Sequence, residues 1–157
     1  MDEGFGLMAE QEALTELGQA LASALSPGDT ALVLKASVLA PTSGGQLLAM
    51  NPDGAFESPE GRFNYADMPT AAIIALEKLR AAAYRESVGT WYSIRLTLTV
   101  DGSVSAEYNY DDEPEWDAPI DPVAYLTDLT KFPRSPEHQP EWLTAKIEEA
   151  RTRRPSP

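Results

Sequence analysis

The stretch that decides the fold is WYSIRLTLTVDGSVSAEYNY, residues 91–110, in which apolar and polar residues alternate on both sides of a DGS turn. Such alternation puts successive side chains on opposite faces of a strand, and a short turn containing Asp-Gly joins two antiparallel strands. The stretch therefore predicts a β-hairpin with one dry face. The residues expected on that face are Tyr92, Ile94, Leu96, Leu98 and Val100 on the first strand, and Val104, Ala106, Tyr108 and Tyr110 on the second.

Two segments before the hairpin and two after it carry apolar residues at intervals of three and four, which gathers them on one face of a helix. We expect a helix over residues 7–25, a second that opens at Pro69, a third that starts at Asp121-Pro122, and a fourth over residues 141–154. The expected buried residues are, helix by helix, Leu7, Leu14, Leu17, Leu21 and Leu25; Ile73, Leu76, Leu79 and Ala83; Leu126 and Leu129; Trp142, Leu143 and Ile147.

Strands are expected between the first two helices. TALVLKASVLA at 30–40 alternates in polarity, a short strand from 46 to 50 follows the turn SGG, and GRFNYA at 61–66 follows the turn NPDG. Helices and antiparallel hairpins in this order predict the α+β class, with the helices packed on one face of a mainly antiparallel sheet. We expect a single domain over residues 1–157, in which the tail from about 152 is disordered.

The composition narrows the classes of function. The chain of 157 residues has no cysteine, which excludes disulfides and thiolate metal sites. Its 25 acidic and 12 basic residues give a net charge of −13, which repels nucleic acid and anionic lipid and suits a basic protein partner. No apolar run approaches about 18 residues, and residues 1–14 lack the positive charge of a signal peptide. We therefore expect a cytoplasmic protein without direct contact to nucleic acid or membrane.

Most of the excess charge lies in one part of the chain, since nine acidic residues and no basic ones fall between Leu96 and Thr130. The densest part is YNYDDEPEWD, residues 108–117, where a tryptophan lies among five acids. The ring either packs on its own domain or is reserved for a partner, since aromatic residues dominate interface hot spots and complementary charge speeds encounter. The candidate partner-binding residues are Tyr110, Asp111, Asp112, Glu113, Glu115, Trp116 and Asp117.

The sequence offers little to an enzyme. Its one histidine, His138, is the single candidate base for a Ser–His pair and lies in a proline-rich connector. TSGGQ at 42–46 lacks the ending of a phosphate-binding loop, and DDEPEWD at 111–117 lacks the spacing of a calcium loop. We expect no catalytic residue, no metal and no cofactor.

The arrangement W…LTLTVDGSVSAEYNYDD over residues 91–112 resembles the YezG-like immunity proteins, which neutralise the toxins of bacterial polymorphic toxin systems. The expected order of elements over residues 7–112 is similar to theirs, whereas the stretch from Pro114 onward has no counterpart in that pattern. The resemblance implies a small cytoplasmic antitoxin that has no catalysis of its own. It also implies a cognate toxin partner, most often a nuclease domain, with an NAD-degrading domain as the other choice.

Two other functions stay open at this point. The chain could be an acidic interaction or adaptor module without a toxin partner, or an enzyme that works through paired carboxylates. A toxin gene directly upstream would favour the antitoxin over the adaptor. A deep cleft that holds two close carboxylates favours the enzyme.

Overall fold

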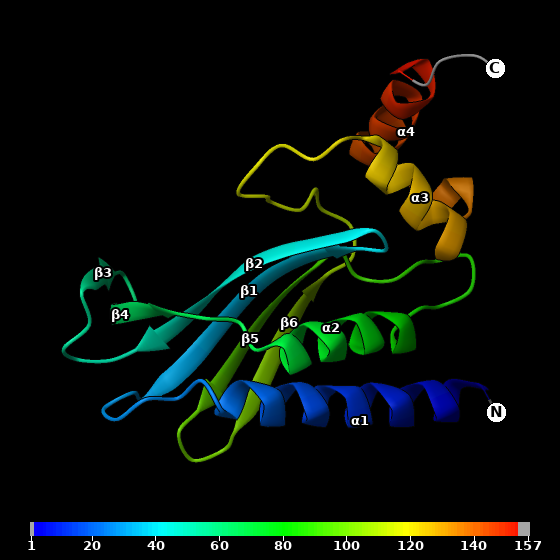
Figure 1. Ribbon diagram of the computed structural model, residues 1–157. Coiled ribbons are helices and arrows are strands. Elements are labelled where there is room, and N and C mark those ends of the chain that lie inside the picture. The colour runs from blue at the N-terminus through cyan, green and yellow to red at the C-terminus, as the bar shows by residue number, and fades with distance from the viewer. Residues whose placement is uncertain (1, 154–157) are drawn as a thin grey trace.

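The computed structural model describes residues 2–153, and Figure 1 shows them as a curved sheet with helices against it. The elements are α1 (Asp2–Ala22), β1 (Ala31–Leu39), β2 (Thr42–Met50), β3 (Phe56–Ser58), β4 (Gly61–Ala66), α2 (Thr70–Ala82), β5 (Ser93–Thr99), β6 (Val104–Asn109), α3 (Val123–Lys131), a 3-10 turn (Pro136–His138) and α4 (Glu141–Arg153). The predicted α+β class is confirmed. None of the helices in this part of the chain combines the length and the apolar character needed to cross a bilayer.

The strands form one antiparallel sheet in the order β3-β4-β2-β1-β5-β6. The predicted hairpin is confirmed as β5–β6, with Leu96 opposite Ala106 and with Gly102 at a φ of 93° in the turn. That positive φ is a conformation that only glycine adopts without strain. The β2 strand begins at Thr42 rather than Gln46, and β3 was not predicted. Glycine and short edge segments give little strand signal, which explains both differences.

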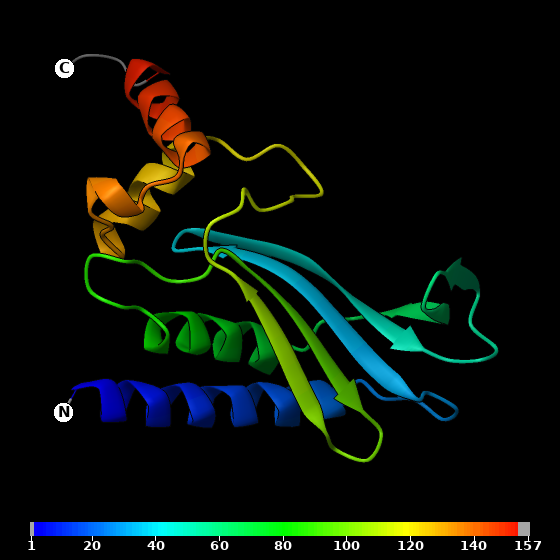
Figure 2. The same ribbon diagram turned by 180° about the vertical axis from the view of Figure 1, so that it is seen from behind.

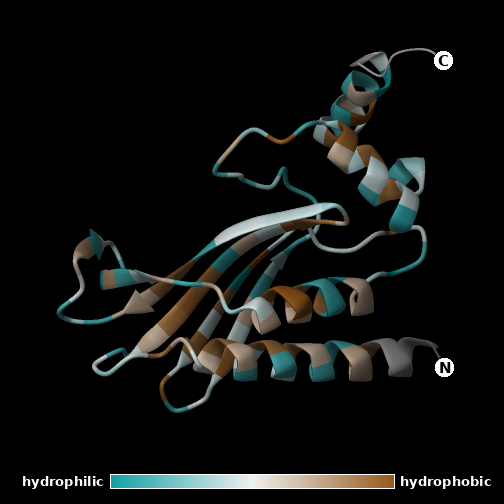
Figure 3. Ribbon diagram, viewed as in Figure 1, coloured by the Kyte–Doolittle hydropathy of each residue, from teal (hydrophilic) through white to brown (hydrophobic). Residues whose placement is uncertain are grey.

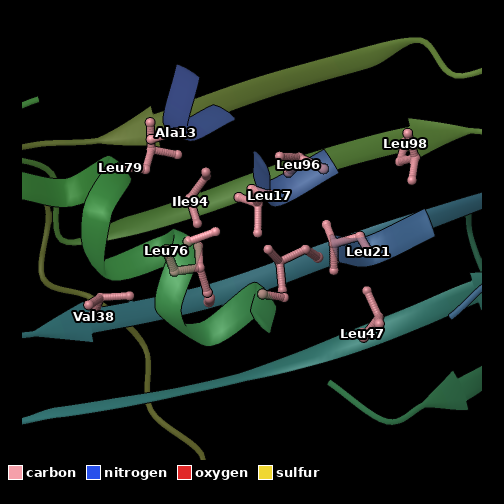
Figure 4. Packing of buried hydrophobic residues seen from close by; sticks show 14 of the residues in the cluster. Ala13, Leu17, Leu21, Val38, Leu47, Leu76, Leu79, Ile94, Leu96 and Leu98 are labelled. Atoms are coloured by element: carbon pink, nitrogen blue, oxygen red, sulfur yellow. The ribbon is translucent and has the colours of Figure 1, made fainter. Parts of the chain in front are cut away.

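One face of the sheet is covered by α1 and α2, which lie side by side beneath it in both views (Figures 1 and 2). Figure 4 shows the leucines of the strands meeting those of the two helices, and Figure 3 shows apolar colour along the inner strands. The main core is therefore the layer between the sheet and this helix pair. Its leucine members are Leu17, Leu21, Leu32, Leu34, Leu47, Leu76, Leu79, Leu96 and Leu98.

The extents and buried faces of α1 and α2 differ from the prediction. The first helix spans Asp2–Ala22 rather than residues 7–25, so Leu25 lies beyond its end and is half-buried. Leu7 is exposed, because the first turns of α1 extend beyond the sheet (Figure 1). Ile73 is exposed as well, and the small residues Ala72 and Ala75 are buried in its place. The prediction chose the bulkiest residues at helical spacing, whereas small side chains allow the two helices to approach each other closely.

The dry face of the hairpin is shorter than the alternation predicts, since Val104 is 36% exposed and Val100, across the turn, is exposed even further. Val100 is 67% exposed, because it already belongs to the turn. Tyr92 is buried, but it packs in a different cluster from Ile94, and Trp91 occupies the main core instead. Trp91 and Tyr92 precede Ser93, the first paired residue of β5, so the strict alternation of strand faces does not apply to them.

The helices α3 and α4 form a second apolar cluster beyond the end of β1, so the expectation of helices on one face holds for α1 and α2. This cluster joins Leu39 of β1 to Leu143 and Ile147 of α4, as predicted for the last helix. In α3 the buried residues are Tyr125 and Asp128, and the predicted pair Leu126 and Leu129 is only half-buried. Only a few residues pack around α3 in this cluster, so one side of Leu126 and of Leu129 remains in solvent.

The structure differs from two expectations, one at the start of α3 and one at the end of α4. The start of α3 lies later than predicted, because the helix begins at Val123 with Pro122 in the N-cap position. Asp121, one residue before that position, still accepts a hydrogen bond from the Val123 N–H through Oδ1 at 2.9 Å. The expected disordered tail was placed too early, since Thr152 and Arg153 belong to α4. Residues 154–157 of that tail lie outside the described residues.

A buried ion pair ties the second cluster to the main core. The guanidinium of Arg80 in α2 donates from both terminal nitrogens to the carboxylate of Asp128 in α3, and its Nε donates to the Trp91 carbonyl at 2.6 Å. The Ala40 N–H, just after β1, donates to the same carboxylate at 2.7 Å. Both side chains are 2% exposed. The pair therefore joins α2, α3 and the end of β1 in one buried contact.

Burial of tyrosines in this part of the protein predicts a loss of stability in alkali. Burial raises the pKa of Tyr92 from 10.0 to about 12, and the positive charge of Arg134 opposes only part of that effect. The unfolded chain therefore loses this proton from about pH 10, whereas the folded protein keeps it to about pH 12. The contribution of Tyr92 to the free energy of unfolding is fully present below about pH 10. This contribution, about 2–3 kcal/mol, should be lost as the pH rises from about 10 to about 12.

The variant Tyr92→Phe isolates this contribution. Denaturant unfolding of parent and variant should be compared in steps between about pH 9 and 12, because lysines and other tyrosines titrate equally in both proteins. The stability of the parent should fall more steeply. Parallel curves for the two proteins would show that Tyr92 ionises as easily in the folded protein as in the unfolded chain.

Candidate functional site

The acidic stretch forms a loop that leaves β6 and arches over the face of the sheet opposite α1 and α2, here called the open face (Figure 1). Asn109, the last residue of β6, fixes the first turn of this loop. Its Nδ2 donates to the Asp112 carbonyl at 2.9 Å, and its Oδ1 accepts the Asp112 N–H at 2.8 Å. The alternation of β6 puts Asn109 on the open face, so the strand itself sets the direction in which the loop departs.

The main chain of the loop is held by side chains from distant segments. Arg134 donates to the Tyr110 carbonyl at 2.6 Å, and Trp142 of α4 donates through Nε1 to the Asp111 carbonyl at 2.7 Å. Ser37 of β1 donates to the Glu115 carbonyl at 2.7 Å. Since these bonds use backbone oxygens, they order the loop without consuming its carboxylates.

Trp116 packs on its own domain. Its Nε1 donates to the hydroxyl of Tyr125 at 3.1 Å, and the ring belongs to the second apolar cluster while remaining half-buried. The ring also lies over β2 at Gly44, where a Cβ would approach it to 3.5 Å. The predicted turn at SGG was wrong, because Gly44 and Gly45 pair with Ser37 and Ala36 of β1 as part of β2. Trp116 therefore supports the loop from below.

The five carboxylates of the loop are exposed, at Asp111, Asp112, Glu113, Glu115 and Asp117. Asp111, whose side chain is 84% exposed, lies 3.8 Å from Arg134. The other four form no ion pair within 4.0 Å with any described cation. The structure thus brings the predicted acids together on one segment whose backbone is hydrogen-bonded to the rest of the protein. Tyr110 stays half-buried beside the main core, and burial raises the pKa of its hydroxyl.

A cleft of about 640 Å³ separates the loop from the open face. Lys35 and Arg95 lie opposite each other on its floor, and Glu107 faces Arg95 from β6. Arg95 also binds Glu60 of the β3–β4 turn at 2.5 Å, and this hydrogen bond lowers the pKa of that carboxyl. The cleft therefore combines a floor with two cations and a rim of carboxylates.

Among the described residues, the cleft contains neither a cluster of metal ligands nor a Ser–His pair. No set of three or more potential ligands among the described residues is placed to hold a metal ion. The only described Ser–His contact joins Ser135 Oγ to His138 Nδ1 at 2.8 Å, within one exposed turn, and neither residue lines the cleft. Ser135 precedes the 3-10 turn, so this contact is local and belongs to the turn.

Sequence reasoning missed the residues that hold the loop in place. Arg134 is the clearest case, because it looked like part of a solvated connector and is in fact buried, with bonds to the carbonyls of Thr90, Tyr110 and His138. An arginine among prolines carries no local sign of such partners. The only usable signal was the pair of tryptophans, Trp116 and Trp142, in an otherwise polar region.

No protein-family model matches the chain, and no curated protein matches its sequence.

Proposed function

We propose that this protein is a non-enzymatic immunity protein, or antitoxin, which acts in the cytoplasm and covers a basic surface of a cognate toxin domain with its acidic loop. The observation that carries the proposal is that the backbone of residues 110–117 contacts the protein itself, whereas the carboxylates of these residues are free to contact a partner. Four backbone oxygens, those of Tyr110, Asp111, Asp112 and Glu115, accept hydrogen bonds from the protein's own side chains, and the carboxylates are exposed. The loop is an ordered anionic surface, as a partner with clustered lysines or arginines requires.

Order in the free protein favours tight binding. A flexible loop loses conformational freedom when it binds, and this loss opposes association. Here the loop is already ordered by Asn109, Trp116 and the bonds from Ser37, Arg134 and Trp142. Exposed carboxylates also attract a basic partner before contact and so raise the association rate.

The chemistry of the proposed partner follows from the same charges. A nuclease or an NAD-degrading domain binds phosphate groups, and arginine and lysine are the residues that do so. A row of carboxylates presents the same sign of charge to that surface as its substrate does. Binding there would block the substrate without any reaction by this protein. In this arrangement the carboxylates make the contact, and Trp116 keeps them in position.

The experiment is co-expression and purification with the product of the neighbouring gene, followed by kinetic measurement of binding. The loop variant changes Asp112→Asn, Glu113→Gln and Glu115→Gln, which preserves shape and removes three charges. The matched control changes Glu12→Gln, Glu77→Gln and Glu86→Gln, three exposed acids located outside the loop. Both variants have the same net charge, so they separate a local effect from a general one.

The loop variant should associate roughly tenfold more slowly than the control at low salt, and added salt should affect it less than the parent. Toxicity of the partner should be suppressed by the parent in the same cells. If both variants associate equally, the loop is not the contact. If the complex forms while toxicity persists, the protein is an adaptor rather than an antitoxin.

A further inference from the structure

An aromatic patch on the β3–β4 hairpin plays no part in the loop or in the main core. Phe56 of β3 lies opposite Phe63 of β4, and Tyr65 follows on the same face. The three rings touch, with centroids 5.0–5.6 Å apart. Phe56 is 48% exposed and Tyr65 is 54% exposed, whereas Phe63 beneath them is buried.

The patch continues into the sheet and lies on the open face. Phe63 is opposite Met50 of β2, and Tyr65 is opposite Leu48, which in turn faces Val33 of β1. Val33, Leu48 and Phe63 form a buried cluster separate from the main core. Val33 lies two residues before Lys35 on the same strand, so both point to the same side of the sheet. The patch and the cleft therefore share one surface.

The dimensions allow one partner to cover both features. From Val33 to Ser37 the strand rises about 13 Å, and from β4 to β1 the sheet extends about 10 Å. A protein interface of standard size buries about 800 Å² on each side, which corresponds to a disc about 32 Å across. The Glu60–Arg95 ion pair also ties the hairpin that carries the patch to the floor of the cleft. A partner seated on the loop would therefore reach the patch.

Such a face could bind either a second copy of this chain or a different protein, and charge distinguishes the two. A second copy of this chain would bring another net charge of −13 against the first, and like charges of this size oppose association. A basic protein is attracted by the same charge. Aromatic residues are enriched at the centre of protein interfaces, and polar residues surround them at the rim.

We propose that Phe56, Phe63 and Tyr65 form the apolar anchor point of the same interface, and that they receive an apolar side chain of the basic partner whose lysines or arginines meet the loop. This inference rests on the proposed function. It adds that binding has two parts with different roles. The loop governs how fast the partner arrives, and the aromatic patch governs how long it stays, since loss of buried apolar contact acts mainly on dissociation.

The test uses the full chain with the product of the neighbouring gene as the probe. The patch variant changes Phe56→Thr and Tyr65→Thr, because threonine keeps the preference for strands and leaves the buried Phe63 in place. The control variant changes Ile74→Gln and Val100→Thr, two exposed apolar residues that lie outside the patch and the cleft. The single variant Tyr65→Thr serves if the double variant fails to fold. Thermal unfolding and size-exclusion chromatography accompany each measurement.

Dissociation of the patch variant should be at least about tenfold faster than that of the control, with little change in the association rate. Equal dissociation rates for patch and control variants, with the parent still bound, would overturn this inference and leave the proposed function standing. Failure of the parent to bind the probe would remove both. A parent that dimerises while the patch variant is monomeric would assign the patch to a second copy instead.

Discussion

Replacing Asp128 by alanine should lower the free energy of unfolding by about 3–5 kcal/mol, the largest effect that we expect from a single substitution. The change leaves the guanidinium of Arg80 buried without its counter-charge and leaves the Ala40 N–H without its acceptor. A domain of this size has a total stability of about 5–15 kcal/mol, so the variant should be close to unfolding. Urea unfolding monitored by tryptophan fluorescence measures the loss.

The control for this prediction is the double variant Arg80→Met and Asp128→Leu. Apolar residues of similar size remove both charges together, and buried ion pairs replaced in this way often keep or gain stability. The double variant should therefore be much more stable than Asp128→Ala alone. A loss below about 1 kcal/mol for Asp128→Ala would mean that water reaches the pair, and that α3 is not held by it.

Replacing Leu96 by alanine should lower the free energy of unfolding by about 2–5 kcal/mol, as for other leucines in a close-packed core. Leu96 is fully buried between the centre of the sheet and the helix pair (Figure 4). The cavity cannot close easily, because β5 is paired on both sides, with β1 and with β6. Chemical denaturation at neutral pH provides the measurement.

The neighbouring substitution Thr97→Ala is the matched control, because it lies on the same strand but points to the open face. Its cost should be roughly 0.5 kcal/mol or less, as for surface positions in general. Similar losses for the two variants would contradict the assignment of one covered and one open face. The same result would weaken the proposed interface, which needs that face to be free.

The sequence alone was sufficient for the elements whose signal is local. The alternation over residues 93–99 identifies β5 and its buried face, because strand geometry repeats every two residues. Helical spacing likewise places Leu17 and Leu21 in the core. The prediction was wrong where the pattern meets the end of an element, at Leu7, Val100 and Val104, and where a small residue is buried in place of a large one, at Ile73.

The candidate site was predicted only as a set of residues. The concentration of acids in 111–117 and their exposure follow from composition, since unpaired carboxylates must stay in water. Their rigid arrangement does not follow from composition. It depends on contacts such as Ser37 to Glu115 and Trp142 to Asp111, which join residues 78 and 31 positions apart.

What the sequence by itself determined is thus the class of the fold, the β5–β6 hairpin and the place of the charge. The tertiary structure alone decided that Trp116 faces its own domain, that Arg134 is buried, and that Arg80 pairs with Asp128 across 48 residues. Periodicity reports which face of an element is dry. A hydrogen bond or an ion pair between distant segments depends on the three-dimensional path of the chain, which no local pattern records.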